Sequence, residues 1–138
     1  MTTNKKYSGS CLCGDVKYTI EAEAQGFYLC HCQQCRKLTG SAMASNIQLK
    51  PTEVTWLSGE DKIKRFDYAG ERMFTKVFCI NCGSAMPYLN ESGSALVIPA
   101  GSLDHDIDID PDVNIFWEDK AHWLESGINA RKCEGFDE

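Results

Sequence analysis

Residues 30–35 read CHCQQC, and this run of three cysteines lies at the centre of the pattern that organises the chain. Two cysteine pairs flank it, in CLCG at residues 11–14 and CINCG at residues 79–83. The remaining cysteine, Cys133, stands alone near the C-terminus. Cysteines with one or two residues between them do not readily form a disulfide with each other, whereas their thiolates can share one metal ion. The clustering therefore predicts metal binding, with a disulfide framework as the alternative.

The two outer pairs form a natural four-thiolate set. Two residues between Cys79 and Cys82 let the chain turn so that both sulfurs face one ion, and Gly83 allows the backbone to bend away. In an extended stretch residues i and i+2 point to the same side, so Cys11 and Cys13 can reach the same ion. A zinc ion on these four thiolates would join the first strand to a late hairpin, and we predict a closed structural site there.

The central cluster supplies only three thiolates, from Cys30, Cys32 and Cys35. Three protein ligands leave zinc with an open position for water or substrate, as in catalytic sites. If Cys30 and Cys32 face the ion from an extended run, His31 points the opposite way, and we expect it to be packed or hydrogen-bonded. The alternative is a second closed structural site, completed by His31, Cys133 or a partner chain. We expect Cys133 to lie outside both sites.

Length and composition indicate one globular domain over residues 1–138, with a mass of 15.4 kDa. The formal net charge of −6 argues against nucleic acid or an anionic membrane as a partner bound through bulk electrostatics. The N-terminus lacks the apolar core of a secretory signal, and no apolar stretch is long enough to span a bilayer. We therefore expect a cytoplasmic protein with reduced thiols.

Short alternating segments predict a mainly β fold. Apolar and polar residues alternate over 16–20, 54–56 and 66–68, and turn residues separate these segments from one another. We expect the other strands at residues 27–30, 73–79, 95–100 and 113–117, and a short helix at 33–38. The acidic segment 104–112 lacks the glycine and distal glutamate of a calcium-binding loop, so we expect a solvated loop there.

The cysteine clusters and their flanks resemble the glutathione-dependent formaldehyde-activating enzyme family, which also includes centromere protein V. The matching stretches are GSCLCGDV at residues 9–16, CHCQQCRKLTGS at 30–41 and FCINCG at 78–83. Residues 101–104 and 116–123 look like the closing segments of the family, so the resemblance covers about residues 7–123. It implies an Mss4-like β-tent, a fold of short antiparallel strands stapled by zinc.

The resemblance also implies two zinc ions per chain. The structural ion would be held by Cys11, Cys13, Cys79 and Cys82, and the catalytic ion by Cys30, Cys32 and Cys35. Members similar to the founding enzyme condense glutathione with formaldehyde to S-hydroxymethylglutathione, which is formally a carbon–sulfur lyase reaction run in reverse.

We therefore expect a zinc-dependent carbon–sulfur lyase-type enzyme. Its partners would be a small thiol such as glutathione, and formaldehyde or a related small aldehyde. The alternative is a non-catalytic zinc-binding module that docks a protein partner, since one scaffold hosts many functions. Arg36, Lys37 and Arg72 are candidates to bind the carboxylates of the thiol, with solvated surface charges as the alternative reading.

Overall fold

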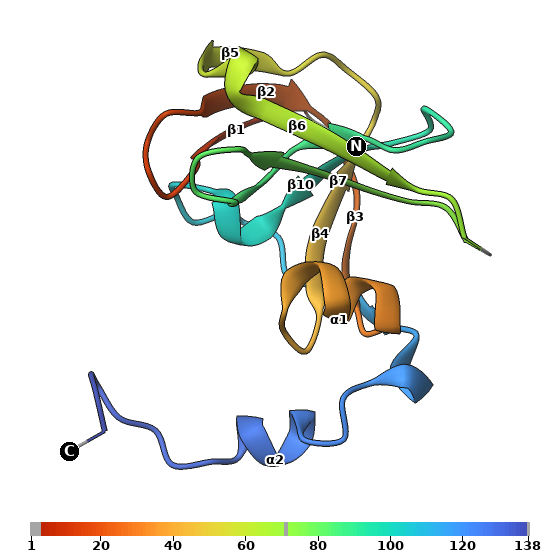
Figure 1. Ribbon diagram of the computed structural model, residues 1–138, viewed down its shortest axis with the longest axis vertical. Helices are drawn as coiled ribbons and strands as arrows, with labels where there is room; N and C mark the ends of the chain where they lie inside the picture. Colours follow the sequence, from red (N-terminus) through yellow and green to blue (C-terminus); the bar gives the residue numbers. More distant parts are fainter. Residues whose placement is uncertain (1–3, 71, 138) are drawn as a thin grey trace.

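The computed structural model describes residues 4–70 and 72–137, which form three small sheets with the two short α-helices below them (Figure 1). The first sheet has the strand order β1 (Lys5–Ser10), β2 (Lys17–Ala22), β5 (Thr55–Ser58). The second has the order β11 (Val113–Ile115), β3 (Ala24–Cys30), β4 (Ala44–Leu49), β10 (Leu96–Pro99), β9 (Tyr88–Leu89). The third has the order β6 (Ile63–Tyr68), β7 (Phe74–Cys79), β8 (Ala85–Met86).

Helices are few and short. The α-helices are α1 (Gln33–Thr39) and α2 (Leu124–Ile128), and single 3₁₀ turns lie at Glu60–Lys62, Ala100–Ser102 and Trp117–Asp119. Within the described ranges, the named strands pair antiparallel except β11, which runs parallel to β3 at the edge of its sheet. The predicted mainly β fold of short antiparallel strands is thus confirmed.

The core is built by alternate residues of the strands. In β2, Tyr18 and Ile20 point inward while Lys17 and Glu21 are exposed, as period-two alternation requires. Strands β1, β4 and β10 bury further apolar side chains, namely Tyr7, Ile47, Leu49, Leu96 and Ile98. Cys11 and Cys79 belong to this packed cluster, so the core itself brings the two outer cysteine pairs together.

Several boundaries differ from the sequence predictions. The strand expected over 113–117 ends at Ile115, because Phe116 adopts a left-handed conformation (φ 54°, ψ 41°) that turns the chain. The strands β1 and β4 were not predicted, since their apolar residues alternate poorly with Ser and Asn. The acidic segment is a loop as expected, and the Asp112 carboxylate accepts a 2.9 Å hydrogen bond from the Phe27 N–H.

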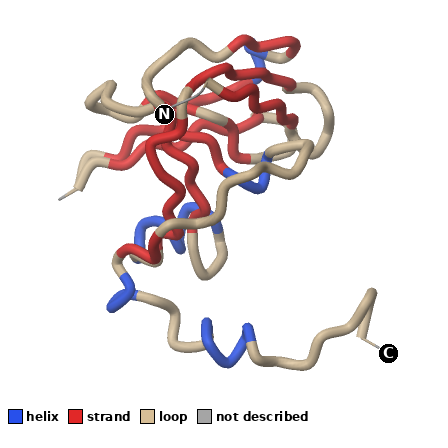
Figure 2. Tube along the Cα trace, turned by 180° about the vertical axis from the view of Figure 1, so that it is seen from behind, coloured by secondary structure: helices blue, strands red, loops and turns tan. Residues whose placement is uncertain are grey.

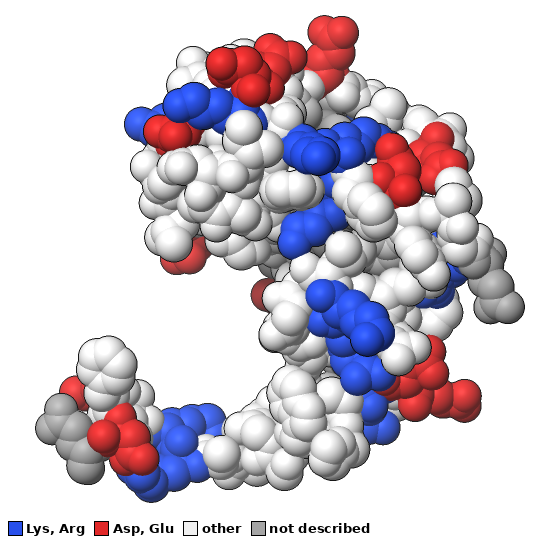
Figure 3. All heavy atoms as spheres, in the orientation of Figure 1, with Lys and Arg blue, Asp and Glu red and all other residues white. Residues whose placement is uncertain are grey.

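The chain beyond β11 leaves the sheets and runs below α1 to the C-terminus (Figures 1 and 2). A run of Lys and Arg side chains crosses the face in view from β6 to α1, although the net charge is −6 (Figure 3). Lys76 of β7 has an internal role, because its Nζ donates a 2.8 Å hydrogen bond to the Leu38 carbonyl in the last turn of α1. No helix of residues 4–70 and 72–137 is both long enough and apolar enough to cross a membrane.

A glycine in β1 permits close packing beside the first cysteine pair. A Cβ at Gly9 would lie 2.3 Å from the Tyr18 hydroxyl oxygen and 2.4 Å from the Ser102 carbonyl oxygen, whereas one at Gly101 would meet no atom within 4 Å. We therefore expect Gly9→Ala to lower the free energy of unfolding by about 1–3 kcal/mol, because backbone at Ser102 must move. Gly101→Ala should change it by less than about 1 kcal/mol. Urea unfolding of both variants tests this, and equal effects would contradict it.

Candidate metal centres and substrate cavity

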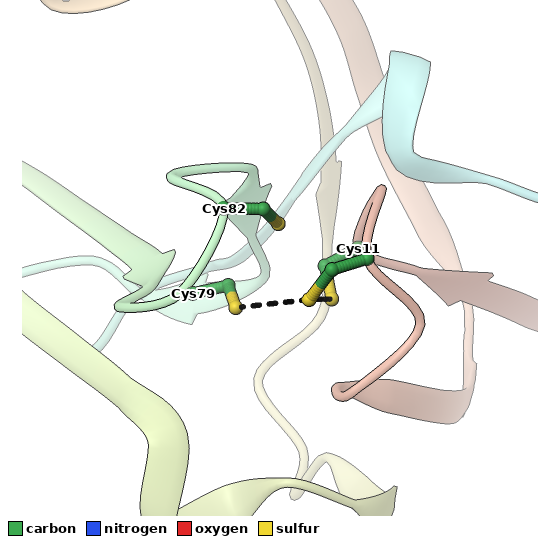
Figure 4. Close-up of side chains that lie close together, drawn as sticks. Cys11, Cys79 and Cys82 are labelled. Carbon is green, nitrogen blue, oxygen red and sulfur yellow. Dashed lines mark hydrogen bonds between the residues drawn. The ribbon is translucent and has the colours of Figure 1, made fainter.

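The turn after β1 and the turn after β7 bring four thiols together. Cys11 and Cys13 lie in the first turn, Cys79 ends β7 and Cys82 lies in the turn that follows it. Figure 4 shows Cys79 and Cys82 on the segment that faces Cys11. The four sulfur atoms all lie within 4.8 Å of one another. Two turns that are far apart in the sequence thus meet at a single point.

These four thiols fit a zinc ion. All eight cysteines are free, so the structure does not support the disulfide alternative. The sulfurs of Cys11 and Cys13 are 3.5 Å apart, and those of Cys13 and Cys79 are 3.8 Å apart. Sulfurs bound about 2.3 Å from a tetrahedral zinc ion are about 3.8 Å from each other, so the observed spacing matches that geometry.

Each turn is shaped to present its pair of sulfurs. Gly14 and Gly83 have φ of 84° and 80°, and their N–H groups bond back to the carbonyls of Cys11 and Cys79. A hydrogen bond with the Ser84 hydroxyl, and then one from the backbone N–H of Cys13, lower the pKa of the Cys82 thiol to about 5. The loop therefore favours a thiolate, which is the form that binds metal.

The central cluster lies where β3 passes into α1. Cys30 ends β3 and pairs with Ala44 of β4, Cys32 is the N-cap of α1, and Cys35 lies in its first turn. The sulfur of Cys32 accepts a 3.3 Å hydrogen bond from the Cys35 N–H. All three residues are buried, and their sulfurs lie within 4.8 Å of one another. A hydrogen bond from Cys35 is the main cause that lowers the pKa of Cys30 to about 6, with smaller help from the positive charge of Arg72.

No fourth ligand completes this group in the part of the chain that the structure describes. His31 is fully buried but turns away: its Nε2 is 2.9 Å from Asn114 Oδ1, and its ring packs edge-on against Trp117. Cys133 is exposed in the tail, where its sulfur accepts a hydrogen bond from Arg131, and it belongs to neither group. Three converging thiols fit a metal ion with an open position.

Comparison with known proteins agrees with this geometry. Residues 6–119 match the family model described as glutathione-dependent formaldehyde-activating enzyme. The chain belongs to this family. The segment matched to the formaldehyde-activating family contains both cysteine groups and ends just before α2. The resemblance drawn from the cysteine motifs is thus confirmed.

Two relatives of this family member extend the comparison. An uncharacterized lyase of Schizosaccharomyces pombe is 28% identical over 89 residues, which are 64% of this chain and 61% of that protein. The chain thus aligns with less than two thirds of that relative's length. A Rhodobacter sphaeroides protein of known crystal structure aligns with a TM-score of 0.53 and 22% identity, over 80% of this chain and 98% of that one. This second likeness supports the fold.

A cavity of about 210 Å³ opens beside the central cluster of this formaldehyde-activating family member. Cys30 and Cys35 form part of its wall, together with Tyr28, Asn46, Gln48, Arg72, Met73, Phe74, Thr75, Tyr88, Asn90, Glu91, Val97, Ile115 and Phe116. Of the three cations that the sequence offered for carboxylate binding, Arg72 alone lines this cavity. Most of the other lining residues could not be chosen from the sequence, because distant strands and the β6–β7 hairpin supply them.

Proposed function

We propose that this chain is a zinc-dependent carbon–sulfur lyase-type enzyme. Its substrate is the adduct of a glutathione-like thiol with formaldehyde or a related small aldehyde. The observation that carries the proposal is the convergence of three buried thiols, of which Cys30 and Cys35 line a cavity, with no fourth ligand in the described ranges. Membership of the formaldehyde-activating family and the similarity to a protein named as a lyase support it.

The two groups of thiols would hold two zinc ions with different roles. Cys11, Cys13, Cys79 and Cys82 would hold a structural zinc ion, and Cys30, Cys32 and Cys35 a reactive one. When bound at the three-thiolate site, zinc supplies Lewis acidity that favours a thiolate and polarises a carbonyl group. This division makes the outer site necessary for the fold and the central site necessary for the chemistry.

The cavity residues would bring the two reactants together. In the addition direction a bond forms between the thiol sulfur and the carbonyl carbon, the π electron pair moves to oxygen, and that oxygen takes the proton of the thiol. The lyase direction reverses each change. Met73, Phe74 and Ile115 line the cavity with apolar surface that limits water, while the amides of Asn46 and Gln48 can donate to the aldehyde oxygen. Holding both reactants here lowers the entropic part of the barrier.

The direct test is the rate at which glutathione and formaldehyde form S-hydroxymethylglutathione, measured by NMR exchange. We expect the zinc-loaded protein to accelerate adduct formation above the spontaneous rate, and removal of the central ion to abolish this acceleration. If the protein holds both ions and gives no acceleration with any small thiol, the enzyme proposal fails. The zinc-binding interaction module would then be the better interpretation.

Metal content gives a second prediction. We expect two zinc ions per chain with unequal retention, because the central ion has three protein ligands beside a cavity and the outer ion has four. Graded addition of a chelator, followed by elemental analysis and circular dichroism, should remove one ion first while the β-sheet signal stays. Simultaneous loss of both ions, or a total of one, would contradict the division into four and three ligands.

A further inference from the structure

Arg72 contributes to the cavity a charge that has no partner among the described residues. It follows the tip of the β6–β7 hairpin and lines the same wall as Cys30 and Cys35. Within residues 4–70 and 72–137, no carboxylate forms an ion pair with its guanidinium, and no acceptor takes a hydrogen bond from it. Glu91 is the other charged residue of the cavity wall, but it is exposed, so solvent screens it. The half-buried guanidinium is therefore available to a ligand.

Two neighbouring segments hold Arg72 in this position. The Gln34 amide of α1 donates a 3.2 Å hydrogen bond to the Arg72 carbonyl, and Gln34 directly precedes Cys35. The guanidinium carbon lies 4.0 Å from the centroid of the Phe116 ring. Phe116 follows Ile115, which pairs with Cys30 across the β11–β3 ladder. Arg72 is thus positioned by α1, which carries Cys35, and by the segment after β11, which pairs with the strand that carries Cys30.

Phe116 adopts an unfavourable backbone conformation in making this contact. It is the one non-glycine residue with positive φ among those that the structure describes. The left-handed region is sterically poor for a bulky side chain, and such strain gathers at functional sites. Here it lets two successive aromatic rings diverge: Trp117 packs on His31, while Phe116 lies against Arg72. A ring on one face leaves the N–H edge of the guanidinium free for a planar anion.

We propose that Arg72, stacked on Phe116, binds a carboxylate of the thiol whose sulfur reaches the Cys30, Cys32 and Cys35 centre. The site would thus select carboxylate-bearing thiols over neutral ones. Arginine matches a carboxylate with two parallel hydrogen bonds, and lysine does not. The cavity volume of about 210 Å³ suits a short mercapto acid or one end of a larger thiol such as glutathione. This inference rests on the proposed function, since it names the class of thiol.

The test compares two thiols of equal length that differ in charge, mercaptopropionate and mercaptopropionamide. Calorimetric titration of the zinc-loaded wild type should show about tenfold or more tighter binding of the carboxylate. Arg72→Met should bring the two affinities to within about threefold of each other by weakening only the carboxylate, and Arg72→Lys should restore part of the preference. The matched control is Lys37→Met, which removes an exposed cation of α1 that does not line the cavity, and should keep the full preference.

Substitution of Phe116 tests the preference for the carboxylate independently of Arg72. Phe116→Leu should reduce the preference for the carboxylate, because it removes the ring under the guanidinium, while Phe116→Tyr should retain it. Thermal unfolding of each variant shows whether it is folded before it is titrated. Equal affinities for the two thiols in the wild type, or equal weakening of both by Arg72→Met, would overturn the proposal.

A third probe separates this inference from the proposed function. Methylthiopropionate carries the carboxylate but has no ionisable sulfur. If it binds in an Arg72-dependent manner and mercaptopropionate binds no more tightly, the anion site stands and the thiol chemistry fails. If both thiols bind equally and lose binding in Cys32→Ser, the thiol chemistry stands and the role of Arg72 is overturned.

Discussion

Cys13→Ser is expected to unfold most of the chain, although Cys13 is exposed. Exposed substitutions normally change the free energy of unfolding by less than about 0.5 kcal/mol, so packing alone predicts almost no effect. Cys13 is, however, one of four thiols that join the turn after β1 to the turn after β7. Structural zinc sites contribute about 10 kcal/mol or more to small domains, which is comparable with the whole stability of a typical domain. Far-ultraviolet circular dichroism and urea unfolding measure the loss.

Cys133→Ser is the matched control for that experiment. Cys133 is also exposed, but among the described residues its sulfur bonds only to Arg131 in the tail, and it lies outside both thiol groups. We expect its replacement to leave the metal content and the unfolding free energy unchanged within about 0.5 kcal/mol. Similar effects of the two substitutions would show that the outer thiols do not hold a structural ion.

The second large effect is expected at the central cluster, where stability and function should separate. Cys32→Ser removes one of three ligands, so the reactive ion should be lost together with thiol binding and turnover. The fold should largely remain, because the four outer thiols are untouched. Serine also suits this position, since the Cys32 sulfur accepts the N-cap hydrogen bond of α1 and a serine hydroxyl can accept it instead. Glutathione titration, elemental analysis and thermal unfolding together test this.

Cys32→Ala distinguishes the loss of the metal ligand from the loss of the N-cap hydrogen bond of α1. Alanine removes both, so it should abolish thiol binding as serine does and lower stability by about 1 kcal/mol more. Retained glutathione binding in either variant would show that the thiol does not reach this centre. Loss of the whole fold in Cys32→Ser would show that the central ion is structural, which was the alternative for this cluster.

The sequence predicted the parts of this molecule that depend on local spacing. Period-two alternation located β2, β5 and β6, and the separation of cysteines grouped the thiols as the structure does. These features succeed because side-chain direction in a strand or tight turn is fixed within a few residues. Strand β4 was missed because its burial comes from neighbours on both sides, β3 and β10, and not from its own pattern.

The cavity could not be predicted in the same way. From the sequence, Arg72 could not be distinguished from Arg36 and Lys37 as a carboxylate-binding residue. In the structure, the β6–β7 hairpin places Arg72 in the wall of the cavity that Cys30 also lines. Phe116 gives no sign in the sequence that it adopts a left-handed conformation, since such residues are usually glycine or asparagine. Sites assembled from distant segments depend on tertiary packing, which local propensity does not report.

The most direct test of an open, thiol-binding centre is cadmium NMR of the protein loaded with two cadmium ions, which thiolate sites accept in place of zinc. We expect two resonances, one from each thiol group. Addition of glutathione should move one resonance and leave the other in place, and the moving resonance should be absent from Cys32→Ser. Two resonances that both stay fixed when glutathione is added would contradict the central claim.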